Sequence, residues 1–499
     1  MVADYYRWPG WRLTRALVSG EVSVEDYVYS VYERIEKLND LLKAYITVRP
    51  VDQVLEEAKR VVEEARRGVD KPLAGLLLAV KDNICTRGLR TTCASRMLSD
   101  YVPPYDATVI ERLKAAGAVI IGKTNMDEFA MGSTGETSAY GAARNPWSLD
   151  RVPGGSSSGT AVALAAGMAT IGLGSDTGGS IRMPSAWTGL YGLKPTYGLV
   201  SRYGLIAYAD SLEQIGPMAR NPIDLALLLE SMAGFDPRDS TTLYYQPRRG
   251  EFVEAALNPR VEGLKVAVPV DLVEHEALHD SIRALVWRLL DHLSRDGVEG
   301  VEVRLGQHIT EYALPAYYVI AMCEASSNLA RYDCVRYGGK TRIPSWESWN
   351  KFYSRVRGRL FGWEVKRRIM LGSWMLSAGY KDQYYVRALK LRRLVRDSML
   401  RILERVDAMV MPVVVTPPPR LGEAIGDPVQ MYLLDLAAVP VNLSGLPSVT
   451  VPVDYVEGIP LGVQVVGRVM GEKTIISIAA AAARRTRMQD LVAEPRGQE

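Results

Sequence analysis

An almost unbroken apolar run from Leu73 to Val80, which ends at Lys81 and Asp82, restricts the fold of this chain more than any other segment. A strand without alternation of polar and apolar residues has to be buried on both faces. Apolar spacing, with caps at Ser23 and Asp106, predicts three helices around it, at about 23–38, 51–67 and 106–116. A short second strand is predicted at 118–121. Strands that alternate with helices indicate an α/β fold, with one large mixed β-sheet covered by helices on both faces.

Two loops rich in serine and glycine follow, Gly154 to Thr160 and Ser175 to Arg182. Glycine lets backbone N–H groups approach a small ligand, and a serine among such donors suits acyl transfer, where a nucleophile lies beside an oxyanion hole. Most clusters of this composition are flexible linkers. Here the first loop runs directly into the small-residue segment Ala161 to Ala169, which predicts a buried helix. We therefore interpret the two loops as a functional pair.

Three shorter motifs match known patterns in the wrong context. Gly117 to Thr124 fits the phosphate-binding loop, yet its four intervening residues are the predicted strand and not an open loop. Gly155 to Gly159 fits the nucleophile elbow with Ser157 at its centre, yet the segment before it is loop-like. His275 and His279 could hold a metal only with a third ligand that the sequence does not place, so no metal site is expected.

A serine nucleophile needs a base, and histidine is the usual one. All four histidines of the chain lie between residues 275 and 308, remote in sequence from both loops. Attention therefore shifts to Lys81 and Lys123, each in a predicted buried strand end, where loss of hydration lowers the pKa of an amine towards that of a usable base. The residues alone do not choose between the two lysines.

Lys81, the Gly154 to Gly159 loop and the segment Asp176 to Arg182 together resemble the amidase signature family. The 24 residues that separate Ser156 from Ser180 fit that family's spacing. The resemblance implies that Ser180 is the acylated nucleophile, that Ser156 bridges it to the base, and that Lys81 is this base. It also implies a cis peptide bond before Ser156.

The second loop is expected to form the oxyanion hole. Backbone N–H groups of Thr177, Gly178 and Gly179, continuing to Ser180, would stabilise a tetrahedral intermediate. One departure from the family pattern is Ser158, where the family usually has glycine. This difference concerns the shape of the first loop and not the chemistry.

Three further stretches, Gly122 to Gly132, Ser327 to Asp333 and Glu364 to Gly372, are similar to the A subunits of glutamine-dependent Asp/Glu-tRNA amidotransferases. In that group the A subunit hydrolyses glutamine, and the B subunit uses the ammonia to amidate misacylated tRNA. The resemblance implies B and C subunits as partners, with misacylated Glu-tRNA(Gln) or Asp-tRNA(Asn) reached through the B subunit. It implies no cofactor in this chain, and ATP and Mg²⁺ used by the partner subunit.

Glutamine requires a cation for its carboxylate and an anion for its ammonium group. By resemblance we assign Arg368 to the carboxylate, with Arg367 as its alternative, and Asp435 to the ammonium group. Tyr317, with Tyr318 as its alternative, is expected to add a hydroxyl to the same pocket. The sequence supports Asp435 separately, because Asp427-Pro428 predicts a helix start that leaves Asp435 inside the apolar segment 431–438, and a carboxylate in such a segment is usually paired.

Composition argues against direct nucleic-acid binding and against a membrane protein. The net charge is only +3, with 47% hydrophobic and 23% charged residues, and acidic residues dilute the basic clusters between 355 and 396. The N-terminus lacks a signal-peptide layout and no segment is apolar enough to span a bilayer, so we expect a cytoplasmic protein with reduced cysteines. Alternative functions are a free-standing amidase that hydrolyses small carboxamides and a non-catalytic scaffold.

The 499 residues exceed the usual size of a single core and are divided here into five expected regions. These are N-terminal helices over residues 1–70, the amidase signature core over 71–220, an α/β continuation over 221–310, a helical layer over the active site from 311 to 405, and closing strands and a helix over 406–499. The strands of the last region are expected at 409–415, 448–453 and 462–466, and the helix at about 473–487.

Overall fold

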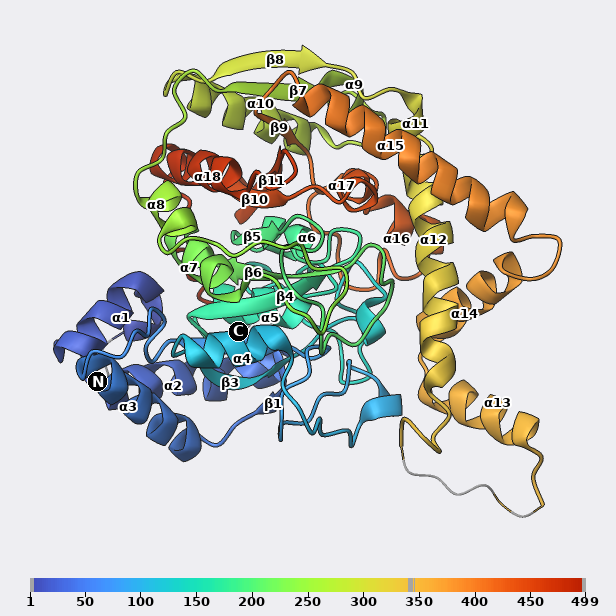
Figure 1. Ribbon diagram of the computed structural model, residues 1–499, viewed down its shortest axis with the longest axis horizontal. Helices are drawn as coiled ribbons and strands as arrows, with labels where there is room; N and C mark the ends of the chain where they lie inside the picture. The colour runs from blue at the N-terminus through green and yellow to red at the C-terminus, as the bar shows by residue number, and fades with distance from the viewer. Residues whose placement is uncertain (1–3, 340–343, 345, 496–499) are drawn as a thin grey trace.

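Eleven strands form one mixed sheet in the computed structural model, which describes residues 4–339, 344 and 346–495. Their order across the sheet is β1-β3-β2-β4-β6-β5-β10-β11-β9-β7-β8 (Figure 1). The strands are β1 (Tyr45–Val48), β2 (Leu77–Lys81), β3 (Val119–Thr124), β4 (Ile171–Asp176), β5 (Tyr191–Lys194), β6 (Gln214–Ala219), β7 (Lys265–Pro269), β8 (Glu299–Val303), β9 (Ala408–Met411), β10 (Ser448–Val456) and β11 (Ile459–Gly467). The predicted α/β fold with a single large mixed sheet is confirmed.

The strands that carry the candidate site lie in the interior of the sheet. Every residue of β2, β3 and β4 is buried, and since successive side chains point to opposite faces, both faces of the sheet are covered there. β2 runs parallel to β3 and to β4. The carboxyl ends of these strands therefore lie at one edge, which brings Lys81 at the end of β2 close to Asp176 at the end of β4.

Two sequence predictions about local structure are wrong in detail. The apolar residues 73–76 are buried but form turns, with the Leu76 N–H donating to the Leu73 carbonyl at 3.0 Å, so β2 is shorter than the apolar run. Apolar composition reports burial and does not distinguish a buried turn from a strand. The helix after Asp106 is capped by Ala107, because the Asp106 carboxylate accepts the Arg87 N–H at 2.7 Å instead. The Ser23 cap is confirmed, with its hydroxyl accepting the Asp26 N–H at 3.0 Å.

Helices pack on the sheet next to the two serine loops and at the N-terminal end. α5 (Ser158–Ala165) begins inside the first loop and packs on β2, β3, β4 and β6, while α6 (Arg182–Ala186) begins after the second loop and packs on β5, β10 and β11. The other helices of this half and the closing helix are α1 (Gly10–Ser19), α2 (Val24–Leu42), α3 (Val51–Arg66), α4 (Thr108–Ala115), α7 (Pro222–Met232), α8 (Glu251–Leu257) and α18 (Glu472–Thr486).

A second group of helices lies along one side of the sheet, drawn in yellow and orange in Figure 1. α12 (Ala313–Asn328) contacts α14 (Trp363–Met375), α15 (Arg387–Leu403) and α17 (Val439–Ser444). Shorter or more peripheral helices are α9 (Val270–Val273), α10 (Asp280–Ser294), α11 (Gln307–Thr310), α13 (Trp349–Leu360) and α16 (Pro428–Leu433). Short 3-10 turns are η1 (Tyr5–Arg7), η2 (Arg96–Leu98), η3 (Glu128–Ala130) and η4 (Leu329–Arg331), and η5 (Asp382–Val386) is a π-helical turn. Of the helices described, none is long and apolar enough to cross a membrane.

Candidate active site

Lys81 and Ser156, 75 residues apart in sequence, are in direct contact. The Lys81 Nζ lies 2.7 Å from the Ser156 Oγ, 2.9 Å from the Ser175 Oγ and 3.1 Å from the Ser175 carbonyl oxygen. Lys81 and Ser156 are fully buried, and Ser175 nearly so. A neutral amine has two N–H donors and one lone pair, so in that form it can donate to Ser175 and accept the Ser156 hydroxyl proton. This is the contact that a lysine base requires.

Burial sets the protonation state of Lys81. Removal of the ammonium group from water lowers the pKa of Lys81 to about 7, even though the carboxylates of Asp127 and Asp176 favour the charged form. A large fraction of the amine is therefore neutral at neutral pH. Such a pKa, close to the working pH, is the property that a general base needs.

Lys123, the competing lysine, is equally buried but has other partners. Its Nζ donates to the Thr91 Oγ1 at 2.8 Å and to the Ile84 carbonyl at 2.5 Å, and it lies 3.7 Å from an Asp82 oxygen. It is part of β3, which occupies the segment that matched the phosphate-binding loop, so that motif has no loop between its glycines. The geometry therefore favours Lys81 as the base.

The first serine loop is held from several sides. The Gly155–Ser156 peptide bond is cis, as the family resemblance implies. The Asp127 N–H donates to the Ser156 carbonyl at 3.3 Å, and the Gly155 N–H donates to the Ser133 carbonyl at 2.8 Å. Ser157 connects the two loops, because its N–H donates to the Ser180 carbonyl at 3.1 Å and its hydroxyl to the Ser175 carbonyl at 3.2 Å. These bonds give Ser157 a structural role.

Ser180 lies in the second loop and is 7% exposed, whereas Ser156 is inaccessible. This difference suits a nucleophile that meets substrate and a bridging residue that does not. Within the described part of the chain, the hydroxyls of Ser156 and Ser180 are not hydrogen bonded to each other. The loops that carry them are nevertheless joined through Ser157 and through the Lys81 contacts with Ser175.

Asp176 shapes the second loop. Its carboxylate accepts N–H groups from Gly179 at 2.9 Å and Ile181 at 3.1 Å, and it pairs with the Arg182 guanidinium at 3.0 Å. Burial by itself would raise the pKa of Asp176, but Arg182 and the hydrogen bond from Asn442 hold it well below the usual range. The group therefore stays charged and keeps the loop in place.

This arrangement corrects the expected oxyanion hole. The Gly179 N–H already donates to Asp176 and is not free, because the carboxylate that shapes the loop takes its donor. Among the described residues, the N–H groups of Thr177, Gly178 and Ser180 have no hydrogen-bond partner and remain available. A Cβ added at Gly178 would clash with the hydroxyl of Tyr317, so the Tyr317 ring lies directly against the loop.

Arg368, on α14, is buried and nearly saturated with partners. Its Nε donates to the Glu364 carboxylate at 2.6 Å, and its Nη1 donates to the Tyr208 hydroxyl at 2.7 Å. Its Nη2 is buried and has no partner among the described residues. Arg367 also pairs with Glu364 but is more exposed, with 22% of its side chain accessible against 3% for Arg368. Arg367 also keeps one buried donor without a partner in that part of the chain, its Nε, so the deeper burial of Arg368 is what favours it as the carboxylate ligand.

Asp435 accepts two hydrogen bonds in the same region. Tyr318 donates to its Oδ2 at 2.6 Å and Ser133 to its Oδ1 at 2.7 Å. Burial raises the pKa of Asp435 to about 6, against the effect of these hydrogen bonds and of Arg368. Asp435 follows α16 and does not lie inside it, since the helix capped by Asp427 ends at Leu433. Part of the apolar segment 431–438 is therefore a buried turn and not helix.

Tyr318 brings the oppositely charged groups together. Its ring lies 5.3 Å from the Arg368 guanidinium, and its hydroxyl bonds to Asp435. Its ring also contacts that of Tyr317, with centroids 5.0 Å apart, and Tyr317 in turn lies against Gly178. A continuous series of contacts thus joins Arg368 and Asp435 to the loop of Ser180. Tyr318 contacts Asp435 directly, while Tyr317 contacts the loop.

Sequence reasoning missed four residues of this site: Ser133, Ser175, Tyr208 and Glu364 as a partner of Arg368. Ser175 and Glu364 carried a usable signal, because they begin the second loop and the stretch Glu364 to Gly372. The histidines are not part of the site. His279 is the N-cap of α10, where its ring nitrogen accepts the Ser281 N–H at 3.2 Å, and His275 lies between α9 and α10. No metal-binding cluster of three His, Cys, Asp or Glu side chains occurs in the described ranges.

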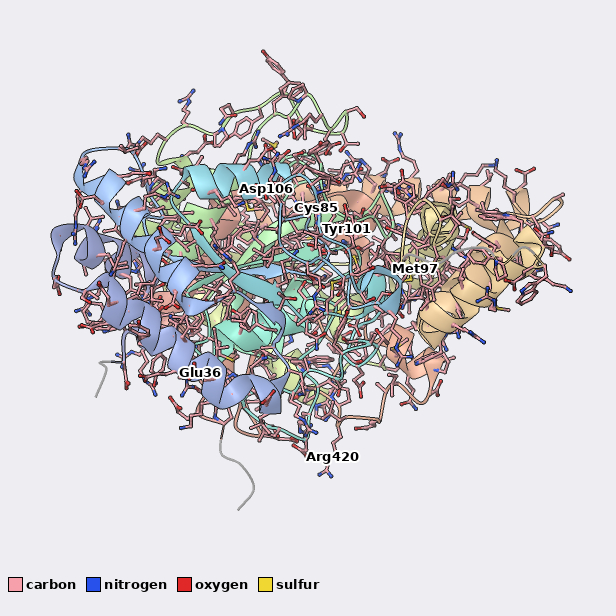
Figure 2. The ribbon with its side chains drawn as sticks, turned by 90° about the horizontal axis from the view of Figure 1, so that it is seen from below. Glu36, Cys85, Met97, Tyr101, Asp106 and Arg420 are labelled. Atoms are coloured by element: carbon pink, nitrogen blue, oxygen red, sulfur yellow. The ribbon has the colours of Figure 1, made fainter. Side chains whose placement is uncertain are left out.

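A cavity of about 800 Å³ lies apart from these residues. Its lining includes Cys85, Tyr101 and Tyr332, of which the first two are labelled close together in Figure 2. None of Lys81, Ser156 and Ser180 lines it. The size of this cavity therefore does not identify the site of acyl transfer.

A buried lysine bonded to a serine, a second serine in an adjoining loop and free backbone N–H donors suit an amidase, an enzyme that cleaves amide bonds. The chain matches the family described as Amidase over residues 26–476, and it belongs to this family. It is 50% identical over 482 residues to the A subunit of glutamyl-tRNA(Gln) amidotransferase from Sulfurisphaera tokodaii, and the match covers 97% of this chain and 99% of the relative. The A subunit of the same enzyme from Symbiobacterium thermophilum is 50% identical over 472 residues, covering 94% and 95%.

Solved structures give the same picture. The crystal structure of the glutamyl-tRNA(Gln) amidotransferase A subunit from Thermotoga maritima superposes with a TM-score of 0.81 at 37% identity, covering 99% of both chains. Peptide amidase from Stenotrophomonas maltophilia superposes with a TM-score of 0.79 at 30% identity, covering 98% of both. The fold is therefore shared by amidotransferase A subunits and by amidases of other substrates.

Proposed function

We propose that this chain is the glutaminase subunit of a tRNA-dependent amidotransferase. It would hydrolyse glutamine to supply ammonia for the amidation of misacylated Glu-tRNA(Gln) or Asp-tRNA(Asn). The observation that carries the proposal is that buried Arg368 and buried Asp435 both contact Tyr318, whose neighbour Tyr317 lies against the Ser180 loop. A substrate with both a carboxylate and an ammonium group fits these two charges, whereas a neutral amide uses neither.

In the first step, neutral Lys81 accepts the Ser156 proton while Ser156 accepts the Ser180 proton, and the Ser180 oxygen attacks the carboxamide carbon of glutamine. The carbonyl oxygen becomes an oxyanion, and the free N–H groups of Thr177, Gly178 and Ser180 stabilise it. Loss of one such donor costs about a hundredfold to a thousandfold in rate in other acyl-transfer enzymes. The proton then returns through Ser156 to the amide nitrogen.

Cleavage of the carbon–nitrogen bond releases ammonia and leaves a γ-glutamyl ester on Ser180. Water gives a proton to the same Lys81–Ser156 relay and attacks the ester carbon. Glutamate leaves, and Ser180 regains its proton. No cofactor takes part in either half-reaction, so this scheme assigns ATP and Mg²⁺ to the partner subunit that activates the tRNA-bound carboxylate.

The names of the relatives support an assembly with B and C subunits, since those relatives are designated A subunits of an amidotransferase. Misacylated tRNA would then be bound through the B subunit, in the cytoplasm where translation occurs. The small net charge of this chain, +3, agrees with tRNA binding by a partner.

Co-purification followed by an ammonia assay tests the proposal. The tagged chain should retain B and C subunits and release ammonia from glutamine, with release stimulated by ATP and misacylated tRNA, and Ser180→Ala should abolish release. A solitary chain that ignores glutamine but cleaves simple carboxamides would instead identify a free-standing amidase. The 30% identity with peptide amidase makes this the relevant alternative.

A further inference from the structure

The Tyr208 hydroxyl is a buried polar group that the catalytic scheme does not use. Tyr208 is 1% exposed and lies in the loop that precedes β6. Its hydroxyl lies 2.7 Å from the Arg368 Nη1, and its ring lies 5.6 Å from the same guanidinium. Burial raises the pKa of Tyr208, although Arg368 opposes the rise, so the hydroxyl keeps its proton at neutral pH.

The O–H group of Tyr208 has no hydrogen-bond acceptor among the described residues. A guanidinium only donates, so the Tyr208 oxygen is the acceptor in its bond with Arg368 and its own O–H remains unused. Among the described residues, no acceptor takes that proton. The Arg368 Nη2, on the same guanidinium, is also buried without a partner in that part of the chain. One guanidinium thus carries one unused donor, its Nη2, and binds through its Nη1 the hydroxyl that carries the other.

The neighbouring carboxylates are already supplied with donors. Asp435 accepts from Ser133 and Tyr318. Glu364 accepts from Arg367 and from the Arg368 Nε. The two unused donors therefore await an acceptor from outside the described chain, and a carboxylate, with two oxygens, matches a pair of donors.

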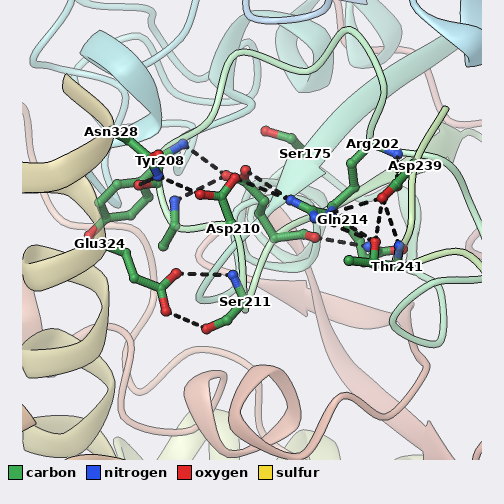
Figure 3. Close-up of polar contacts among 12 residues, drawn as sticks. Ser175, Arg202, Tyr208, Asp210, Ser211, Gln214, Asp239, Thr241, Glu324 and Asn328 are labelled. Atoms are coloured by element: carbon green, nitrogen blue, oxygen red, sulfur yellow. Dashed lines mark hydrogen bonds and ion pairs between the residues drawn. The ribbon is translucent and has the colours of Figure 1, made fainter. Parts of the chain in front are cut away.

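The backbone around Tyr208 is rigidly held. Its N–H donates to the Glu213 carboxylate at 2.9 Å, and its carbonyl accepts from the Asn328 side chain at 3.3 Å. Asn328 also donates to Asp210 at 2.8 Å, and Ser211 donates to Glu324 on the same helix, α12 (Figure 3). The loop is thereby tied to the helix that carries Tyr317 and Tyr318, so the hydroxyl is fixed relative to the pocket.

We propose that Tyr208 is a specificity-determining residue that donates its hydroxyl proton to one oxygen of the substrate's α-carboxylate, while the Arg368 Nη2 donates to the other. This inference rests on the proposed hydrolysis of glutamine at this site. It assigns to Tyr208 a direct contact with substrate, and not only the positioning of Arg368.

Tyr208→Phe tests the contact because it removes only the hydroxyl. In the complete complex, kcat/KM for glutamine should fall on the order of tenfold to a hundredfold, the usual effect of losing a hydrogen bond to a charged group, mainly through KM. 4-Aminobutanamide, which is glutamine without its carboxylate, should lose nothing. Where an analogue is not turned over, its Ki as a competitive inhibitor of glutamine hydrolysis gives the same comparison.

Tyr318→Phe is the matched control, since Tyr318 serves the ammonium side through Asp435. It should impair glutamine and 4-aminobutanamide but spare glutaramic acid, which lacks the amino group. Equal losses on all substrates in Tyr208→Phe would overturn the proposal, as would no loss on glutamine. In an Arg368→Lys background, Tyr208→Phe should still lower kcat/KM for glutamine. If Tyr208→Phe has no effect in that background, Tyr208 only positions Arg368, and the direct contact with substrate is refuted.

Two further results keep the test decisive. 4-Aminophenylalanine at position 208 keeps a hydrogen donor on the ring and should restore part of the glutamine affinity. If Tyr208→Phe does not fold, this variant replaces it: a preference for glutamine over 4-aminobutanamide that is reduced but still present supports the proposal, and an unchanged or absent preference overturns it. A wild-type complex that releases no ammonia from glutamine would refute the proposed function itself, a result distinct from any failure of the Tyr208 variants.

Discussion

The pH dependence of glutamine hydrolysis follows directly from the burial of Lys81. A lysine pKa that falls from 10.5 to about 7 corresponds to about 5 kcal/mol in favour of the neutral amine. The neutral fraction is then about nine-tenths at pH 8 and about one-tenth at pH 6. The value of kcat should therefore rise about tenfold between these values and level off above about pH 8. An unperturbed lysine would instead give a rate that keeps rising about tenfold per pH unit up to pH 10.

Initial rates of ammonia release from pH 5.5 to 9.5, analysed as kcat and kcat/KM, measure this profile. Histidine usually titrates near this midpoint, and the chain has four: His275, His279, His292 and His308. Burial also brings the pKa of Lys194, Glu128 and Glu213 to about 7, so a variant of each of these is measured beside the histidine variant. A variant with all four replaced should keep the midpoint, whereas Lys81→Ala should be inactive. A midpoint that disappears with the histidines, or a rate that still climbs above pH 9, would refute the assignment of Lys81 as a desolvated base.

Three other perturbations have defined outcomes. Asp435, with a pKa of about 6, must be charged to hold an ammonium group. The slope of log kcat/KM against pH should therefore steepen from one towards two below pH 6. Asp435→Asn should remove this extra steepness and raise KM. Gly178→Ala places a methyl group against the Tyr317 hydroxyl and should lower kcat about a hundredfold in the ammonia assay while leaving the circular dichroism spectrum unchanged. Ser23→Ala removes the cap of α2 and should lower the free energy of unfolding by about 1 kcal/mol in urea titrations, without a change in KM.

Local patterns in the sequence predicted the elements that lie within one segment. The Ser23 cap, the buried strand ending at Lys81 and the cap at Asp427 depend on neighbouring residues, so spacing and residue type are enough to find them. Ser156 and Ser180 are only 24 residues apart, so their spacing could also be found from the sequence. The predicted start of the strand that ends at Lys81 was wrong by a few residues, because an unbroken run of buried apolar residues occurs in turns as well as in strands. Residues 73–76 form such a turn.

Contacts between distant segments were beyond this reasoning. Lys81 and Lys123 occupy similar strand ends, and only the fold shows that one meets Ser156 and the other meets Asp82. The hydrogen bond from the Gly179 N–H to the Asp176 carboxylate depends on the conformation of the loop, which the residue types do not predict. Tyr208, which contacts Arg368 across 160 residues, lies in an ordinary apolar segment and carries no motif.

Detection of the acyl-enzyme shows whether Ser180 is the nucleophile. The purified complex is mixed with glutamine, quenched in acid within milliseconds, digested and analysed by mass spectrometry. We expect a γ-glutamyl ester on Ser180 in the wild type, its absence in Ser180→Ala, and failure to form it in Lys81→Ala. A glutamyl ester on Ser156 or Ser157, or ammonia release with no ester on any serine of the two loops, would refute the assignment of Ser180 as the nucleophile.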